Sequence, residues 1–439
     1  YFERGGNRWR WNRQKLQLPQ GGSVDLIRMT MERMPESVQT TLKTAASIGS
    51  SFSLKVLRIM LPLTDVARAL EVASKPSFVV RERRKDTYRF VHDQIQEAAY
   101  SMIPEHERAA FHLSMLRKLW EADEGTGVHW TYAVGQLTKC TNEIESLRER
   151  GKAASLLLKA GRKACSSSAF GTALAYLKLG IDVLGQSRWK EQYDICLTLH
   201  NLSAEVAYAW GDMAQLDALT NSIVLHSKSY EERGEAYSMK ILSLGATRHV
   251  DEAIELGLEV LSALGEKFKR PSKTSSLVDV WRTRIALRRL SPSGVLNLPL
   301  MTDPKKLVAM KIINLLFVYA KLAKPDLALP LAVRMVKLTL RHGLSAISAC
   351  GFATFSIVLA SGIPLVRNVD DAYNLSKLSL RLLDKFESTK RQWLPRVYVA
   401  CYGMVFPWKE PITYAFEPLL KAYKVGVNTG DVEYGLMAA

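Results

Sequence analysis

From Glu105 to the last residue, the sequence reads as a succession of helices, and no run in it shows the clear alternation of a β-strand. Small residues recur where two helices must come close together. Ala173, Leu216 and Ala253 mark equivalent places in successive helix pairs. An amphipathic helix pair of this kind can bury its apolar stripe only against another pair. The chain is therefore constrained to stack helix pairs into a right-handed solenoid.

The repeat is looser than that of tetratricopeptide proteins. The three equivalent positions lie 43 and then 37 residues apart, whereas a tetratricopeptide repeats after about 34 residues. Loop-forming residues flank one basic helix between residues 266 and 304, which predicts a basic insertion there. We therefore predict connecting helices over 105–150 and tetratricopeptide-like repeats over 151–439. Three later segments are each expected to be the second helix of a pair: 326–342, 370–386 and 417–429.

Residues 23–104 have a different character. Ser23 begins a helical pattern, and three or four short helices follow before Pro76. Two apolar runs, Phe78–Val80 and Tyr88–Val91, are then separated by polar residues, which predicts a β-hairpin. This order outlines a winged-helix domain, and the Gly- and Arg-rich residues 1–22 are interpreted as a linker. The expected fold class is mostly α: a winged-helix domain with a short β-hairpin, followed by a tetratricopeptide-like α-solenoid.

The charge of the chain is strongly positive. Its 439 residues include 60 Lys and Arg against 43 Asp and Glu, a formal net charge of +17. Such a balance suits nucleic acid, an anionic membrane surface or an acidic partner domain. The basic residues form separate clusters rather than one block, which is typical of solvated faces. The five cysteines are widely spaced without a C-x-x-C pair, which favours a reducing, cytoplasmic setting over a disulfide framework or a zinc site.

One stretch is long enough to raise the question of a membrane span, because residues 343–366 contain no charge. Four serines and the break at Gly362-Ile363-Pro364 interrupt it, which favours a buried repeat helix and its turn. No transmembrane segment is therefore expected. The chain begins at Tyr1 rather than Met and ends in an uncapped helical pattern, from which we expect a piece of a longer polypeptide.

The sequence contains no recognised catalytic motif. A G-x-x-x-x-G-K-[ST] phosphate-binding loop, G-x-S-x-G, H-E-x-x-H and the kinase signatures are all missing. The remaining candidate is the pair His92 and Asp93, where a predicted strand runs into a helix. In the structural interpretation Asp93 caps the helix and His92 fills space beside the core. In the functional interpretation the imidazole donates a hydrogen bond to an anion that an adjoining domain places at the helix N-terminus.

Residues around this pair resemble a known family. The stretch FVHDQIQEAAYSMIP (90–104), preceded by LKTAASIGSSF (42–52), is similar to the region after the ATPase core of STAND-class AAA ATPases, a group also described as origin-recognition-like. The resemblance is greatest to members of large hybrid signalling proteins, which combine a serine/threonine kinase-like domain with GAF and histidine-kinase domains. It extends into the repeats, for example at 204–208 and 429–434, and covers essentially the whole chain.

The resemblance implies a nucleotide-driven switch in which the winged helix packs on the ATPase core. By resemblance alone, His92 is the candidate sensor that touches the phosphate of the nucleotide, and Asp93 orients or caps it. ATP or ADP would be bound mainly by a domain absent from this chain. The sequence departs from the family pattern at Asn12, where relatives commonly carry an acid. It also lacks the phosphate-binding loop, so ATP hydrolysis is not assigned to these residues.

The leading hypothesis is a regulatory and protein-interaction segment of such an ATPase in signal transduction, in which the repeats bind a protein partner or the neighbouring kinase domains. One alternative is a winged-helix DNA-binding regulator with a ligand-sensing repeat array. Its third helix, Ser53–Leu61, offers only Lys55 and Arg58 for contacts to DNA, so nucleic acid is the less favoured partner. The other alternative is a scaffold that acts independently of nucleotide.

Overall fold

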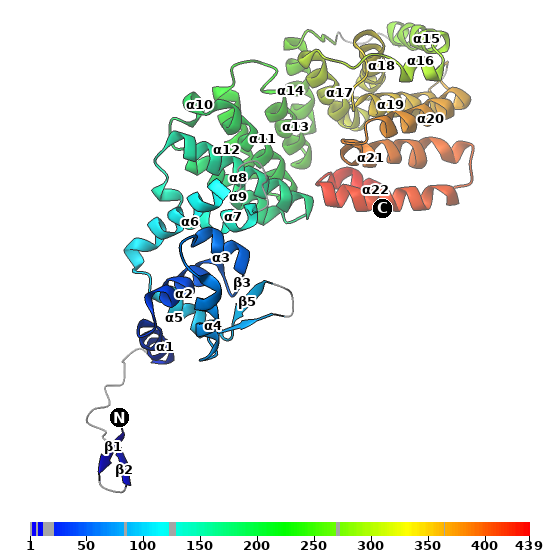
Figure 1. Cartoon of the computed structure of the whole chain (residues 1–439). Helices are drawn as coiled ribbons and strands as arrows, with labels where there is room; N and C mark the ends of the chain where they lie inside the picture. The colour runs from blue at the N-terminus through cyan, green and yellow to red at the C-terminus, as the bar shows by residue number, and fades with distance from the viewer. Residues whose placement is uncertain are drawn as a thin grey trace. The chain divides into compact units, whose positions relative to one another are not determined.

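The computed structural model describes residues 2–5, 8–11, 22–82, 86–122, 129–268, 273–363 and 365–439. The chain divides into two compact units, Tyr1–Leu156 and Leu157–Ala439, and the boundary falls inside helix α8 (Leu147–Ser166). Helices dominate both units (Figure 1). The predicted mostly α fold with a small β component is therefore confirmed.

The first unit begins with a pair of antiparallel strands and continues with helices and a small sheet. Its described elements are β1 (Phe2–Gly5), β2 (Arg8–Trp11), α1 (Gly22–Glu32), α2 (Glu36–Ile48), β3 (Ser51–Ser53), α3 (Leu54–Met60), α4 (Val66–Ser74), β4 (Val79–Arg81), β5 (Thr87–Phe90), α5 (Asp93–Ser101), η2 (Glu105–Glu107), α6 (Arg108–Ala122), α7 (Trp130–Leu137) and η3 (Thr141–Glu143).

Strand β5 is the centre of a three-stranded antiparallel sheet with the order β3-β5-β4. The β4–β5 hairpin was predicted from its two apolar runs and is confirmed. Strand β3 was not predicted, because it is three residues long and exists through its pairing with β5, where Phe52 lies opposite Tyr88. The Phe52 side chain is buried, and its ring lies 5.4 Å from that of Phe90. The sheet thereby closes over the core that α2, α3 and α4 form beneath it.

The second unit is built of helices connected in sequence. After α8 come α9 (Phe170–Val183), α10 (Arg188–Glu191), α11 (Tyr193–Trp210), α12 (Met213–His226), α13 (Gly234–Ala246), α14 (Val250–Ala263), α15 (Lys273–Arg289), α16 (Pro292–Leu296), α17 (Pro304–Ala323), α18 (Pro325–His342), α19 (Ser348–Ala360), α20 (Val369–Lys385), α21 (Lys390–Tyr398), η4 (Val399–Val405), η5 (Phe406–Trp408), α22 (Thr413–Thr429) and α23 (Val432–Ala438).

Consecutive helices of this unit pack side by side, as the repeat pattern predicted. Ala173, Leu216 and Ala253 are all fully buried at 0% exposure, in α9, α12 and α14. The three segments expected to be second helices are α18, α20 and α22. Among the described residues after Glu105, the β structure is an isolated bridge between Leu300 and Leu344. None of the described helices is both long and apolar enough to cross a membrane, in agreement with the interpretation of residues 343–366.

Helix α17 is the core of the second unit. Most of its residues from Ala309 to Ala320 are buried, and it packs against α13, α14, α18 and α19. Three glycines on α13 and α14 face its side chains: a Cβ added at Gly234, Gly245 or Gly257 would lie 2.6, 2.2 and 2.5 Å from Val308, Tyr319 and Leu316, respectively. Real Cβ atoms do not approach other heavy atoms so closely. The three helices therefore reach their observed separation because these positions have no side chain.

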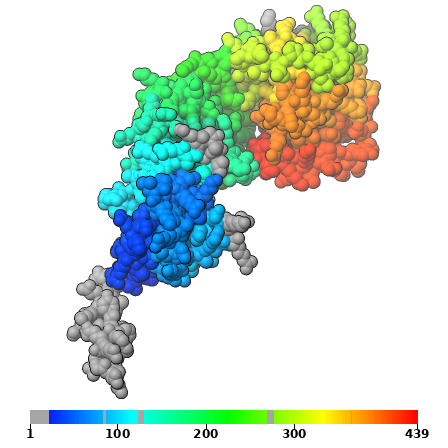
Figure 2. Space-filling view, viewed as in Figure 1, coloured from blue at the N-terminus to red at the C-terminus, as the bar shows by residue number. Residues whose placement is uncertain are grey.

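The C-terminal helices return to the first helices of the same unit. Arg396 of α21 forms a two-pronged salt bridge with Asp431, from Nε to Oδ2 at 2.9 Å and from Nη2 to Oδ1 at 3.3 Å. The turn before Asp431 lies against α9 and α11, because a Cβ added at Gly430 would be 4.0 Å from Phe170 and 2.9 Å from Ala209. Ser168, just before α9, also has its Oγ 3.4 Å from the carbonyl oxygen of Asn428 in α22, 260 positions away. In Figure 2 the red surface of α22 and α23 borders on the green surface of the earlier helices.

The predicted basic stretch 266–304 contains α15 and α16, and several of its charges are paired within the unit. Arg284 donates to Asp371 at 2.6 Å, which connects α15 to α20. Lys337 of α18 donates to Asp279 at 2.6 Å, and Glu266 accepts from both Lys306 and Arg334. The bonds of Arg284 and Asp279 attach α15 to α20 and α18, and those of Glu266 attach the segment after α14 to α17 and α18.

Replacement of Gly257 by Ala tests the close approach of α14 to α17. The new Cβ would collide with Leu316, which is fully buried, so we expect the free energy of unfolding to fall by about 1–3 kcal/mol. Denaturant titration of the chain measures this change. The control is Gly171→Ala on α9, whose Cβ would meet the exposed Trp210 ring at an ordinary 3.4 Å. Equal effects of the two substitutions would contradict the packing argument.

Stability should also depend on pH through His200 of α11. Burial lowers the pKa of His200 to about 4, although its hydrogen bond to the Cys196 carbonyl opposes this shift. In the unfolded chain, His200 takes up its proton near the ordinary pKa of 6.5. The contribution of neutral, buried His200 to the free energy of unfolding is therefore complete above pH 6.5 and is lost as the pH falls from 6.5 toward 4. We expect a loss of roughly 2 kcal/mol between pH 7 and pH 5 from this residue.

Amide hydrogen exchange of α11 at the two pH values measures the effect. His200→Gln should remove that part of the pH dependence, whatever it does to the absolute stability. His249→Gln, at an exposed position just before α14, is the control and should leave the pH dependence unchanged. A parallel pH dependence in all three proteins would show that His200 is not responsible.

Candidate functional site

The sequence-predicted pair lies where β5 leads into α5 in the first unit. His92 has an extended backbone and is the N-cap of α5, and its Nδ1 accepts a hydrogen bond from the Gln94 N–H at 3.2 Å. Asp93 is the first residue of the helix. The expectation that Asp93 caps this helix is therefore wrong. The imidazole reaches the backbone N–H two positions on because His92 precedes the first helical turn, whereas Asp93 is already part of it.

The capping bond determines where the proton of neutral His92 lies. Because Nδ1 accepts, the ring proton is on Nε2. Both His92 and Asp93 are exposed, so this Nε2–H is available as a hydrogen-bond donor at the start of a helix. The neighbouring Asp93 carboxylate repels an anion, and the ring already occupies the Gln94 N–H. An anion would thus be bound by the edge of the imidazole rather than by the backbone of the helix.

The other end of α5 enters a buried chain of hydrogen bonds. Tyr100 Oη lies 2.9 Å from His112 Nε2, His112 Nδ1 lies 2.7 Å from Gln136 Oε1, and Gln136 Nε2 donates to the Ser47 carbonyl at 3.1 Å. Since Gln136 uses its amide N–H for Ser47, its oxygen accepts from His112 Nδ1–H, and His112 Nε2 accepts from Tyr100. Burial lowers the pKa of His112, which favours this neutral arrangement. This series of hydrogen bonds connects α5 with α6, α7 and α2.

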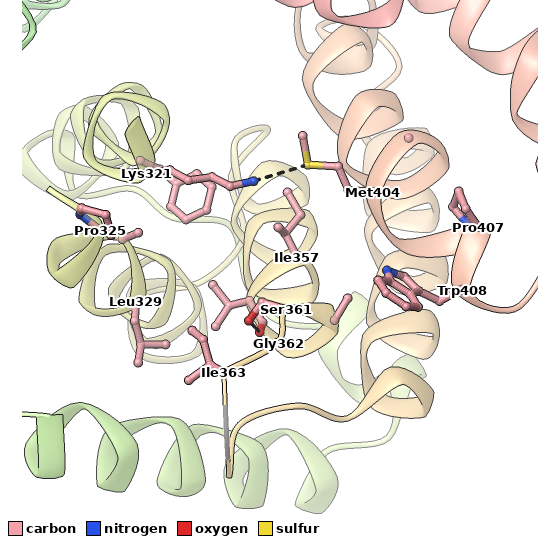
Figure 3. Close-up of a pocket in the computed structure, with 15 residues that line it drawn as sticks. Lys321, Pro325, Leu329, Ile357, Ser361, Gly362, Ile363, Met404, Pro407 and Trp408 are labelled. Atoms are coloured by element: carbon pink, nitrogen blue, oxygen red, sulfur yellow. Dashed lines mark hydrogen bonds between the residues drawn. The ribbon is translucent and has the colours of Figure 1, made fainter. Parts of the chain in front are cut away.

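The second unit contains a cavity that the sequence did not indicate. It has a volume of about 740 Å³ and is bounded by α17, α18, α19 and the segment η4–η5. Figure 3 shows Pro325 and Leu329 on one side, Met404, Pro407 and Trp408 on the other, and Ile357 between them. Lys321 extends from α17 across this space, and its Nζ lies 3.9 Å from Met404 Sδ. Apart from Lys321 and Ser361, the side chains that line the cavity are apolar.

A smaller chamber of about 170 Å³ adjoins the cavity. The two share Phe317, Lys321, Ile357 and Met404 as lining residues. The small chamber is the more polar in its residues, because Asn314, Thr354, Arg396 and Tyr434 also line it. Asn314 is 3% exposed, and its Nδ2 has no hydrogen-bond partner within the described part of the chain. Buried amide groups usually have partners, and Asn314 Nδ2 is one of eight buried side-chain nitrogen or oxygen atoms of the described residues that have none.

A weak signal for this chamber was present in the sequence. Asn314 is a single amide within the apolar run Ile312-Ile313-Asn314-Leu315-Leu316-Phe317. A polar residue inside such a run either has a buried partner or faces a cavity. The walls that come from α19 and η4–η5 could not be foreseen, because they are distant in sequence from α17. Within the described residues, no group of three or more His, Cys, Asp or Glu is placed to hold a metal ion.

Comparison with known proteins gives two similarities, and no family model matches the chain. The hybrid signal transduction histidine kinase G of Dictyostelium discoideum is 21% identical over 451 aligned residues, which cover 82% of this chain but 13% of the kinase. The chain thus matches a small part of that protein. Among solved structures, a STAND protein with a tetratricopeptide repeat sensor from Pyrococcus horikoshii aligns with 95% of this chain and 67% of its own, at 13% identity and a TM-score of 0.29.

Proposed function

We propose that the chain is a regulatory and protein-interaction segment of a STAND-class AAA ATPase in signal transduction. Residues 23–104 would form a winged-helix domain that senses nucleotide state, and the repeats would bind a protein partner or neighbouring kinase domains. ATP or ADP would be bound mainly by a domain outside this chain. The observation that carries the proposal is the hydrogen bond from the Gln94 N–H to His92 Nδ1 at the exposed start of α5, which leaves Nε2 of the neutral ring as the donor for a phosphate.

The arrangement of the first unit supports the winged-helix assignment. Helix α2 is followed by β3, then by α3 and α4, and then by the β4–β5 hairpin, with β5 between the other two strands. Helix α5 leaves the sheet directly after β5 and packs against α1 and α2. Ser23 donates to Gln94 at 3.1 Å, and Gln96 donates to the Ala46 carbonyl at 3.3 Å. His92 is therefore held on a firmly packed helix.

A signal at His92 would pass along α5. The proposed sensor, His92, lies at the N-terminus of this helix, and Tyr100 lies near its C-terminus. Tyr100 bonds to His112 of α6, which in turn bonds to Gln136 of α7. A shift of α5 would leave the buried acceptor of His112 or the hydroxyl of Tyr100 without a partner, which costs about 1–3 kcal/mol. The network would thus favour two discrete positions of α5 over a continuum, as a switch requires.

The alternative of DNA binding has less support. The helix that precedes the hairpin, and that would enter the major groove in a DNA-binding winged helix, is α4 rather than the Ser53–Leu61 segment considered from sequence. Arg68 is the one basic residue in α4, and it is accompanied by Glu71. Specific recognition of DNA bases usually takes several donors on this helix.

Replacement of His92 by Ser separates nucleotide sensing from helix capping. Ser is a good N-cap, so the stability of the first unit should be preserved, whereas the imidazole donor is lost. In the longest natural polypeptide that contains this chain, we expect the affinity for ATP or ADP to fall about tenfold. Calorimetric titration with each nucleotide measures it. His106→Ala, at another exposed histidine of the same unit, is the control and should bind nucleotide normally. Unchanged affinity in the His92→Ser protein would favour the nucleotide-independent scaffold.

The DNA hypothesis is tested by titration of the chain with duplex DNA at two salt concentrations. We expect weak binding, of the sort that any basic protein shows, because the positive charge is spread over separate clusters. Arg68→Ala should change this binding no more than Arg391→Ala, which removes one exposed charge from the second unit. Tight binding with a steep salt dependence that Arg68→Ala abolishes would replace the nucleotide-sensor proposal for residues 23–104.

A further inference from the structure

Lys321 differs from the other lysines of α17. Lys305 lies 3.4 Å from Glu231, Lys306 lies 2.6 Å from Glu266, and Lys311 is paired with Glu235. Just beyond the end of the helix, Lys324 lies 3.1 Å from Asp251. Lys321 has no carboxylate within ion-pair distance in the described part of the chain, and its contact is the thioether of Met404. The lysine that lacks an acidic partner is the one that reaches into the cavity.

The cavity around Lys321 has the size and lining of a small-molecule site. Sites for small molecules range over about 300–1,000 Å³ and are mostly apolar, with a few polar groups that orient the ligand. The volume of about 740 Å³ lies within this range. Phe317, Leu329 and Ile357 give the cavity an apolar wall, and Trp408 closes one side of it (Figure 3). The Arg367 guanidinium lies 4.9 Å from the centre of the Trp408 ring and so supports it from outside.

The adjoining chamber adds one buried polar group to this space. Asn314 presents an amide donor that has no partner among the described residues, and Lys321 lines both the chamber and the cavity. Arg396 also lines the chamber, but its charge is balanced by the salt bridge with Asp431. An acceptor group that carries a negative charge would complement both Lys321 and Asn314. Lys321 is itself exposed, so water can solvate its ammonium in the empty site, and an anionic group would add a direct ion pair there that a neutral or cationic group would not.

We propose that this site binds a small amphipathic carboxylic acid, with the carboxylate at Lys321 and Asn314 and the apolar body in the large cavity between α17, α18, α19 and η5. The ligand would be a fatty-acid-like or aromatic-acid metabolite rather than a phosphate or a sugar, because the walls are apolar and one lysine supplies the charge. Binding at this site is independent of the nucleotide sensor proposed for the first unit, since every residue named lies in the second.

Calorimetric titration of the chain with decanoate, compared with its methyl ester, tests the proposal. We expect saturable binding of decanoate with one site per chain and at least tenfold weaker binding of the ester, because the ester keeps the apolar body and loses the charge. Lys321→Met keeps a side chain of similar length and should weaken decanoate about tenfold without affecting the ester. Lys324→Met, which removes a charge from the same helix end outside the cavity, should bind decanoate as the parent chain does.

Asn314→Leu gives a second readout that does not depend on Lys321. The substitution removes a buried donor without a partner, so the melting temperature without ligand should stay the same or rise. The affinity for decanoate should nevertheless fall several-fold. Equal binding of acid and ester, unchanged affinity in the Lys321→Met protein, or no saturable binding by a parent chain that melts cooperatively would each overturn the proposal. None of these results would alter the nucleotide titration of the His92→Ser protein, so the two proposals can fail separately.

Discussion

The second unit depends on the burial of α17 between Ala309 and Ala320. A helix in this position must be approached closely by its neighbours, and three glycines on α13 and α14 allow that approach opposite Val308, Leu316 and Tyr319. Three of its four lysines, Lys305, Lys306 and Lys311, pair with glutamates of α13 or of the connecting segments around it. The packing of α17 therefore fixes both the spacing of the helices and the places where charge is tolerated in the interior of the array.

The cavity is a consequence of the same packing. Near the end of α17, the neighbours change from closely packed helices to α19 and the π-helical segment η4, which do not fill the space beside Phe317 and Lys321. The salt bridge of Arg396 with Asp431 holds α21 against the start of α23, next to the small chamber. A polar group can then remain buried at Asn314, where continuous helix packing would have excluded it.

The first unit has a different kind of core, in which a sheet covers helices. Strand β5 is paired on both sides and leads without a loop into the cap of α5. Helix α5 is thus fixed at one end by the sheet and at the other by the buried bonds of Tyr100, His112 and Gln136. This double attachment links the position of α5 to that of α6 and α7.

Much of the fold follows from local sequence, since helical periodicity, small residues such as Ala173 and Ala253, and the paired apolar runs of the hairpin act over a few residues. The sequence therefore determined the helical array, the β4–β5 hairpin and the position of His92 at the start of α5. Only tertiary structure decided that β3 forms, that His92 rather than Asp93 caps α5, and that Lys321 and Asn314 face one space with Met404. Most of these features depend on contacts between residues that are distant in the sequence. The sequence pattern of one helix does not show which side chains of the neighbouring helices will pack against it.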